Sequence, residues 1–261
     1  MASSIVVASG KGGVGKTSMA VNIGLTLAGV GHRTALLDAD FGMANAHILL
    51  GVNPEHHIID TLEGRVPLEA ALCNTANGMR FISGGSGLLE MLNLDQKTRY
   101  QAIRLMDEIA IDTDYLIIDA PAGASDSSLA FVTAADHVVV VVVGEPTSFL
   151  DAYALIKAAN LEGGIRNFNI VINMAQSAKE ARAHYDKFSE IATRFLDVNL
   201  NLAGHMLLSN RIRQSIVKRK PISLEDPKLD ENLSLKSLVK NVIGGKRNDH
   251  SGVRFFSKSA A

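Results

Sequence analysis

Residues 9–18 read "SGKGGVGKTS", and this stretch decides the fold. An apolar run, "IVVA", precedes it, and an amphipathic pattern that predicts a helix follows it. The glycines let backbone N–H groups converge on phosphate oxygens at the positive end of a helix. A lysine there neutralises phosphate charge, and a following hydroxyl can ligate Mg²⁺. The pattern G-x-x-x-x-G-K-[ST] is met by Gly10, Gly15, Lys16 and Thr17, so we predict a nucleotide-binding loop.

A second lysine, Lys11, stands directly after the first glycine of this loop. One lysine is enough to hold the phosphates of a bound nucleotide. Composition and spacing do not explain the second.

The overall composition limits the class of protein. The chain has 261 residues, 47% of them hydrophobic, and a formal net charge of -1, so it can form a large core without a strong global field. Cys73 is the only cysteine, which excludes an internal disulfide and any CxxC metal or iron–sulfur site. We find no basic leader or signal-length apolar stretch at the start, and "HVVVVVV" at 137–143 is too short to span a bilayer. We therefore expect a soluble, cytoplasmic protein.

Short β-branched runs alternate with longer helical patterns along the chain. Almost wholly apolar runs are typical of parallel strands covered by helices on both faces. We expect an α/β fold with a doubly wound, mostly parallel sheet, whose ligands lie at the carboxyl ends of the strands. The predicted helices follow the loop as far as Gly31 and lie at about 94–110, 148–161 and 177–196. The predicted strands are Ile5–Ala8, Thr34–Asp38, Met79–Ile82, Tyr115–Asp119, Val138–Val143, Asn169–Asn173 and Leu202–Leu208.

The composition shifts near Gly244-Gly245. We predict one domain over residues 1–244 and a loosely held polar tail over 245–261. The tail ends in "VRFFSKSAA", too short for a stable helix in water. It is either a disordered tail or the remnant of an interfacial amphipathic helix.

Three aspartates belong to the predicted site by position. Asp38 and Asp40 in "ALLDAD" are two residues apart and so point to the same side of an extended chain. Asp119 ends the strand in "YLIIDAPAG". Carboxylates at the carboxyl ends of buried strands supply the oxygens that Mg²⁺ needs. The alternative is a role in a turn or a helix cap.

Longer segments carry a family resemblance. "SGKGGVGKT", "LLDADFGMANAHILLGV" and "IIDAPAG" resemble the deviant Walker A, switch I and switch II segments of MinD/ParA-type ATPases. "GEPTSFLDAYALIK", "NMAQSAKEARAHYDKF" and "RFLDVNLNLAG" resemble the FlhG/FleN branch, which sets flagellar number and placement. The resemblance runs from about residue 4 to residue 243. It implies a P-loop NTPase fold and an ATP-dependent dimerisation switch with slow, Mg-dependent, dimer-activated hydrolysis of ATP.

The resemblance also assigns roles to residues. Lys11 would reach across a dimer to the phosphates that the partner subunit holds, Lys16 would grip the phosphates of its own site, and Asp40 would orient the attacking water. Thr17 would ligate Mg²⁺, with Asp38 and Asp119 holding its water ligands, and Asn173 would read the adenine. Where relatives have a Pro-Tyr-Asp-like turn near the base, this chain has Leu207-Leu208-Ser209. The residues that would wrap ATP or ADP are Gly12, Gly13, Val14, Gly15, Lys16, Thr17 and Ser18.

The implied partners follow from the branch. They are a second copy of the chain, an FlhF-like GTPase, and a FleQ-like transcription regulator or switch-complex proteins. Weak, dimer-dependent contact with the inner membrane or the cell pole is also implied. Asp151, Tyr153 and Lys157 on the predicted 148–161 helix are candidates for a docking face, or ordinary exposed residues.

Two further patterns have alternative interpretations. "RIRQSIVKRK" at 211–220 has five basic and no acidic residues. It is either a solvated helix face, which we favour, or a DNA-backbone patch of a ParA-like positioning ATPase, so we expect no nucleic-acid partner. Glu55-His56-His57 could suggest a metal site, but adjacent histidines point apart and no third ligand has helical spacing, so we expect a loop there.

Overall fold

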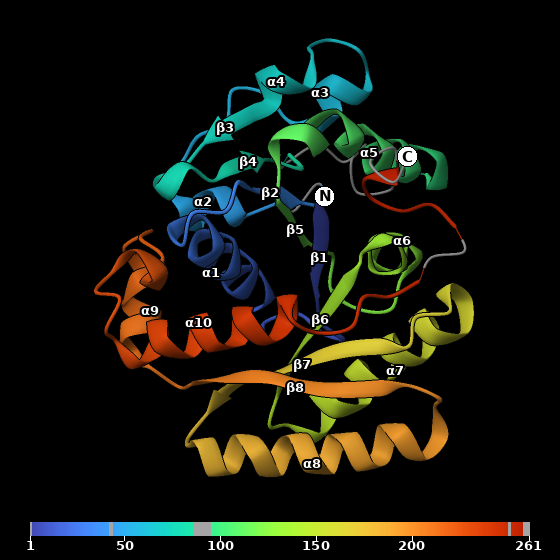
Figure 1. Cartoon of the computed structure of the whole chain (residues 1–261), viewed down its shortest axis with the longest axis vertical. Helices are drawn as coiled ribbons and strands as arrows, with labels where there is room; N and C mark the ends of the chain where they lie inside the picture. Colours follow the sequence, from blue (N-terminus) through green and yellow to red (C-terminus); the bar gives the residue numbers. More distant parts are fainter. Residues whose placement is uncertain (1, 42–43, 86–94, 250–251, 258–261) are drawn as a thin grey trace.

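A computed structural model of the chain describes residues 2–41, 44–85, 95–249 and 252–257. Its centre is one eight-stranded sheet with the order β3-β4-β2-β5-β1-β6-β7-β8 (Figure 1). Every neighbouring pair is parallel except β3 and β4. The strands are β1 (Ser3–Ala8), β2 (Thr34–Asp38), β3 (Leu72–Asn74), β4 (Arg80–Ile82), β5 (Tyr115–Asp119), β6 (His137–Val143), β7 (Asn167–Ala175) and β8 (Asn199–Leu207).

Helices cover both faces of the sheet and enclose two separate hydrophobic cores (Figure 1). One face carries α1 (Lys16–Gly29), α2 (Ala46–Leu50), α9 (Asn210–Val217) and α10 (Asp230–Ile243). The other carries α5 (Gln96–Leu105), α6 (Asp126–Ala134), α7 (Pro146–Gly163) and α8 (Ala178–Phe195). The short elements are α3 (Ile58–Leu62), α4 (Leu68–Ala71), η1 (Ala76–Gly78), η3 (Met106–Asp112) and η4 (Ile222–Leu224).

The central strands explain why the fold forms. All seven residues of β6 are buried, and six of them are valines, whose branched side chains pack well on a pleated surface. Successive side chains point to opposite faces, so each strand contributes to both cores. This arrangement confirms the predicted doubly wound, mostly parallel sheet.

Most predicted strands are close to the observed ones. The bounds of β2 and β5 agree, whereas β7 and β8 begin two and three residues earlier than expected because polar asparagines start them. β3 has no counterpart among the predicted strands, since "LCN" is too short to show a period. This antiparallel edge strand lies far from the predicted site.

The described part of the C-terminal segment differs from the loosely held tail that we expected. From α10 it crosses to the side of α5 and α6 (Figure 1). Phe255 and Phe256 are 2% and 4% exposed and belong to the core on that face. The Phe255 amide donates to the Ala134 carbonyl (3.1 Å), and its ring stacks on Phe131 at 6.5 Å. Burial of two aromatic rings outweighs the polar composition of the surrounding sequence.

Among the described residues, none of the helices has the length and apolar character that crossing a membrane requires. Within residues 252–257, both phenylalanines are buried in the protein and so do not form an exposed apolar face.

Candidate nucleotide-binding site

The loop between β1 and α1 has the backbone conformation of a phosphate cradle. Gly13 and Gly15 have φ angles of 80° and 88°, which side-chain-bearing residues rarely adopt. A Cβ atom on Gly15 would also lie 2.5 Å from the Asn173 Nδ2. Gly15 is the N-cap residue of α1, so the first N–H groups of this helix are available to an anion.

Neighbouring elements hold the loop in place. The Ser9 hydroxyl donates to the Lys11 carbonyl (2.9 Å), and the Asn173 amide at the end of β7 donates to the Val14 carbonyl (2.8 Å). The backbone of α7 packs so closely that a Cβ atom on Gly10 would lie 2.1 Å from the carbonyl carbon of Asp151. The cradle is therefore fixed from the β7 side and from the α7 side.

Lys16 and Asp119 form a buried ion pair at the base of the loop. The Lys16 Nζ lies 2.6 Å from the Asp119 Oδ1, and the side chains are 8% and 1% exposed. Burial raises the pKa of Asp119, and the Lys16 ammonium and the Thr17 hydroxyl oppose that rise. The second carboxylate oxygen, Oδ2, is buried without a hydrogen-bond partner. An unsatisfied buried oxygen is costly, so this atom marks a place for a further ligand.

Asp38 lies beside this pair because β2 and β5 are in register, with Asp38 opposite Asp119. Its carboxylate accepts backbone N–H groups from Asp40 (3.2 Å), Asn45 (3.0 Å) and Ala46 (3.0 Å). Burial, followed by the charge of Asp119, raises the pKa of Asp38 to about 7, although these hydrogen bonds and Lys16 favour the ionised form. Two buried carboxylates side by side repel each other unless a cation joins them.

Asp40 is half-buried, two residues beyond Asp38. Burial raises the pKa of its carboxyl, Lys16 opposes the rise, and Asp119 adds to it. In the described part of the chain its side chain has no hydrogen-bond partner. The structure therefore brings Asp38, Asp40 and Asp119 to the same edge of the sheet as Lys16, as the strand ends predicted.

The donor set fits Mg²⁺. This ion prefers carboxylate, hydroxyl and water oxygens. The site offers the half-buried Thr17 hydroxyl at the start of α1, the Asp38 carboxylate at the end of β2 and the Asp119 Oδ2 at the end of β5. A divalent cation there would stabilise both carboxylates in their ionised form against the burial that raises both pKa values and the Asp119 charge that adds to the rise at Asp38.

Lys11 does not join this cluster. Its Nζ lies 2.5 Å from the Glu145 Oε2 and 3.2 Å from the Thr147 Oγ1, both at the exposed start of α7. The Lys11 and Glu145 side chains are 29% and 63% exposed. The two loop lysines thus have different surroundings, one buried beside the carboxylates and one at the surface.

The region proposed for the adenine is narrow. Asn173, Met206 and Ile212 line a space of only about 30 Å³, and the Asn173 amide is used to hold the loop. Leu207 and Leu208 are 41% and 61% exposed. Ser209 caps α9 by accepting the Arg211 amide. The role of Asn173 in reading the adenine therefore stays a prediction.

Three residues near the site are not predicted by the sequence. Glu145 and Thr147 bind Lys11, and the sequence "GEPT" indicates only the family resemblance and not this contact. Met174 follows Asn173 at an irregularity between β7 and β8 and has a φ of 58°, a strained conformation that only the structure reveals.

The Glu55-His56-His57 segment has a local structural role. His57 is the N-cap of α3, and its backbone N–H donates to the Asp60 carboxylate (2.7 Å). Among the described residues, no group of three His, Cys, Asp or Glu side chains could hold a metal ion by itself.

Comparisons with curated proteins give two close relatives. The chain is 38% identical over 238 residues to the antiactivator FleN of Pseudomonas aeruginosa, covering 91% of this chain and 85% of that protein. It is 31% identical over 225 residues to the flagellum site-determining protein YlxH of Helicobacter pylori, covering 83% and 73%.

Solved structures share the fold. MinD in the MinC:MinD cell division complex of Aquifex aeolicus is 26% identical and has a TM-score of 0.77, with 97% of this chain and 100% of that one covered. The septum site-determining protein MinD of Pyrococcus horikoshii, solved with Mg-ADP, is 21% identical and has a TM-score of 0.78, with 94% and 98% covered.

A family profile decides the assignment. The profile described as "ParA: NUBPL iron-transfer P-loop NTPase" matches residues 1–243, which is nearly the whole chain. With its glycine cradle, buried lysine–aspartate pair and FleN-like sequence, the chain belongs to the ParA family of P-loop NTPases.

Proposed function

We propose that this protein is an ATP-dependent dimerisation switch that regulates flagellar number and placement. ATP would bind each subunit and join two subunits face to face, the dimer would dock partners, and hydrolysis would release them. The similarity to FleN and YlxH supports the flagellar setting.

The different surroundings of the two lysines carry this proposal. Lys16 is buried at its own cradle, whereas Lys11 lies in the same loop but is bound to Glu145 at the surface. A surface lysine beside a phosphate loop can supply positive charge to a second subunit, as an arginine finger does. ATP binding and dimerisation would then be one coupled equilibrium.

Within a subunit, the residues would divide the work of hydrolysis. Lys16 would leave Asp119 and bind phosphate oxygens of the nucleotide instead. The Asp119 carboxylate would then be available to the metal site. The N–H groups of Gly12 to Ser18 would bind the phosphates. Lys11 of the other subunit would stabilise the negative charge that develops on the leaving ADP. Asp40 would orient the water whose oxygen bonds to the γ-phosphorus while the bond to the ADP oxygen breaks. The products are ADP and phosphate.

Mg²⁺ is the metal that we propose for this site. Thr17 would ligate it, and Asp38 and Asp119 would hold its water ligands. When bound, it would neutralise phosphate charge.

The partners that we propose are proteins of flagellar assembly. An FlhF-like GTPase and a FleQ-like transcription regulator or switch-complex proteins are the candidates. The MinC:MinD cell division protein complex is an example of a protein of this fold bound to a second protein. Peripheral contact with the inner membrane or the cell pole would follow dimerisation.

Sedimentation with ADP and with a non-hydrolysable ATP analogue tests the switch. We expect monomers with ADP and dimers with the analogue. Asp40→Ala should remain dimeric with ATP itself, because it would bind but not hydrolyse the nucleotide. Single chains at every protein concentration with the analogue would contradict the proposal.

A separate assay tests Lys11. The Lys11→Ala variant should bind nucleotide as the wild type does but lose dimer-activated hydrolysis, whereas Lys16→Ala should lose nucleotide binding. Full hydrolysis by Lys11→Ala would refute the role in trans. Flagella counted in a deletion strain complemented with each variant then test the biological setting.

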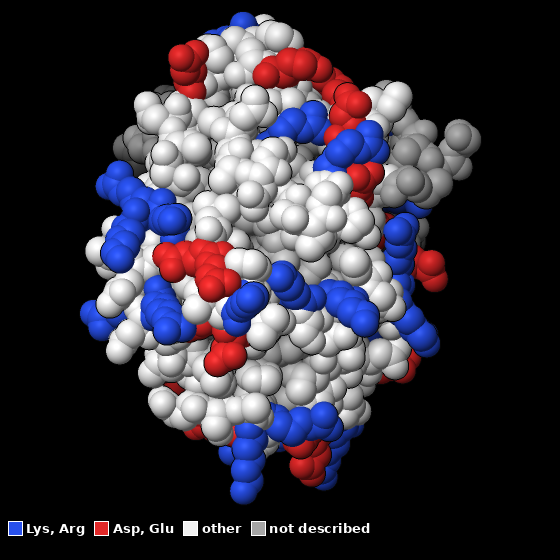
Figure 2. Space-filling model, turned by 60° about the vertical axis from the view of Figure 1, so that its left-hand side comes forward, with Lys and Arg blue, Asp and Glu red and all other residues white. Residues whose placement is uncertain are grey.

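A second candidate function is a ParA-like positioning ATPase that binds DNA without sequence specificity. The five basic side chains between 211 and 220 are all exposed on α9 and the turn after it. Figure 2, however, brings the α9 side of the molecule forward and shows Asp and Glu side chains among the Lys and Arg side chains of that face, which favours a solvated surface. Salt-sensitive, ATP-dependent retention on DNA that is lost on neutralising Lys218, Arg219 and Lys220 would favour the DNA function.

A further inference from the structure

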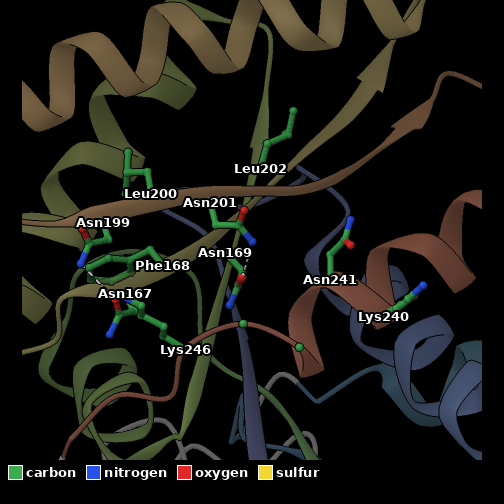
Figure 3. Close-up of a pocket in the computed structure, with 12 residues that line it drawn as sticks. Asn167, Phe168, Asn169, Asn199, Leu200, Asn201, Leu202, Lys240, Asn241 and Lys246 are labelled. Atoms are coloured by element: carbon green, nitrogen blue, oxygen red, sulfur yellow. Dashed lines mark hydrogen bonds between the residues drawn. The ribbon is translucent and has the colours of Figure 1, made fainter.

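A second pocket lies at the opposite end of the sheet from the phosphate loop (Figure 3). It has a volume of about 690 Å³, within the range of small-ligand sites. Its walls are the starts of β7 and β8 and the end of α10 with the turn that follows. Five asparagines give it its character: Asn167, Asn169, Asn199, Asn201 and Asn241. We call it the carboxamide pocket.

Four of these side chains form a two-step ladder across the strands. The parallel register places Asn167 opposite Asn199 and Asn169 opposite Asn201. In each pair the β8 amide donates to the β7 side-chain oxygen at 3.1 Å (Figure 3). The ladder orients the carboxamides, because each pair fixes one acceptor and one donor. The Asn167 amide also donates to the Arg247 carbonyl (3.3 Å), so the groups left for the pocket are the Asn169 amide and the side-chain oxygens of Asn199 and Asn201.

Asn169 presents an oriented hydrogen-bond donor to the pocket. It is 4% exposed, and its Oδ1 accepts from Asn201, yet its Nδ2 has no hydrogen-bond partner among the described residues. This group opens into the pocket (Figure 3). Because the rest of the residue is packed, the pair with Asn201 holds this donor in one orientation toward the pocket, where a ligand can accept from it.

The charge of the pocket indicates the kind of ligand. Lys240 and Lys246 line it, both exposed, and none of its lining residues is acidic. In the described part of the chain, neither ammonium group has a hydrogen-bonding or ionic partner. An anionic group would therefore be attracted, and it would not meet a repelling carboxylate on the lining.

The spacing of the ladder indicates the shape of the ligand. Its two steps are two strand residues apart, roughly 6.6–6.8 Å, which is also the two-residue repeat of an extended peptide. A carboxamide offers a donor and an acceptor side by side, the complement of a peptide group. We propose that the carboxamide pocket binds a short, extended segment of a partner protein that carries at least one carboxylate.

This site is separate from the phosphate loop. Asn167 begins the strand that reaches Asn173 six residues later, so the two sites are about 20 Å apart. Peptide binding in the pocket can therefore be tested independently of the proposed dimerisation switch.

A peptide library tests the proposal on the full-length protein. Five-residue peptides randomised at every position would be selected on the wild type and counter-selected on the double variant Lys240→Glu, Lys246→Glu. Both lysines are exposed, so this variant should fold. We expect the enriched peptides to contain Asp or Glu and to bind the double variant at least ten times more weakly. Lys179→Glu, a charge reversal at an exposed lysine of α8, is the matched control and should bind as the wild type does.

The asparagine side-chain amide signals in nitrogen-15 NMR spectra then locate the binding. An enriched peptide should shift the Asn169 and Asn201 signals saturably, and Asn169→Leu should abolish binding while urea unfolding confirms that it folds. Asn201→Leu, at an exposed position, serves the same purpose if Asn169→Leu does not fold. Peptides without acidic residues, equal binding to the double variant, or shifts caused by a nucleoside monophosphate but by no peptide would each overturn the proposal.

Discussion

At the scale of single residues, the two lysines of one loop differ because of their neighbours. Lys16 lies between buried carboxylates, whereas Lys11 is held at the surface by Glu145 and Thr147. An exposed ion pair stabilises by only about 0.2–1 kcal/mol, so the contact that holds Lys11 can be broken at small cost. If Lys11 serves a second subunit, Glu145 competes with that subunit for it.

Removing this competitor should favour the dimer. In Glu145→Ala, dimerisation should need about two to five times less ATP analogue, as expected from the loss of an exposed ion pair. Sedimentation as a function of analogue concentration measures the midpoint. Glu162→Ala, an exposed glutamate near the end of the same helix, should leave the midpoint unchanged. A higher midpoint in Glu145→Ala would show that this carboxylate helps the dimer instead.

Asp38 gives a prediction on pH. Its pKa is raised to about 7 in the folded protein, mainly by burial, and is near 3.9 in an unfolded chain. The folded state therefore binds the proton more tightly, so the contribution of Asp38 to stability falls as pH rises from about 4 to 7. Without metal, Asp38→Asn should gain stability relative to the wild type across this range, by about 1–3 kcal/mol.

Urea unfolding in the presence of a chelator, at several pH values, measures this difference. Adding millimolar Mg²⁺ at about pH 8 should raise the melting temperature of the wild type more than that of Asp38→Asn, because the ion would use the carboxylate. A difference between the two proteins that does not vary with pH would show that Asp38 titrates at its ordinary pKa.

At the scale of elements, the phosphate loop depends on the close approach of α7. A Cβ atom on Gly10 would lie 2.1 Å from backbone of α7, whereas one on Gly12 would meet nothing within 4 Å. Backbone cannot move aside as a flexible side chain can. The conformation of the loop is therefore tied to the position of a helix that begins more than 130 residues later.

This contrast predicts unequal effects for two similar substitutions. Gly10→Ala should destabilise the protein by more than about 2 kcal/mol through overpacking. Gly12→Ala should change stability by less than about 1 kcal/mol. Urea unfolding without nucleotide measures both. Equal, small effects would mean that α7 does not press on the loop in solution.

At the scale of the whole molecule, the C-terminal segment closes the core on the α5–α6 face. Phe255 is 2% exposed, and the segment connects the two faces of the sheet after α10 (Figure 1). Removing an aromatic side chain of this size from water stabilises the folded state. Residues 252–257 are thus part of the packed structure, and the Ser257 hydroxyl donates to the Asp107 carboxylate (3.1 Å).

Truncating this ring should be costly. Phe255→Ala should lower the free energy of unfolding by about 3 kcal/mol, since it leaves a cavity in the core. Phe195→Ala is the matched control, because that ring is 67% exposed at the end of α8, and its loss should cost less than about 1 kcal/mol. Similar small losses for both would indicate that the C-terminal segment is not docked.

Local sequence was sufficient for much of this protein. The loop at 9–18, the apolar strands that surround it and the aspartates at the ends of two of them predicted the fold class and the position of the site, because glycine conformation, strand period and strand-end carboxylates are local properties. The tertiary structure alone decided which groups meet across the chain. Lys11 with Glu145, Gly10 against α7, the burial of Phe255 and the carboxamide ladder join residues that are distant in sequence. No local pattern contains such contacts, since they depend on how the strands are ordered and how the helices pack on them.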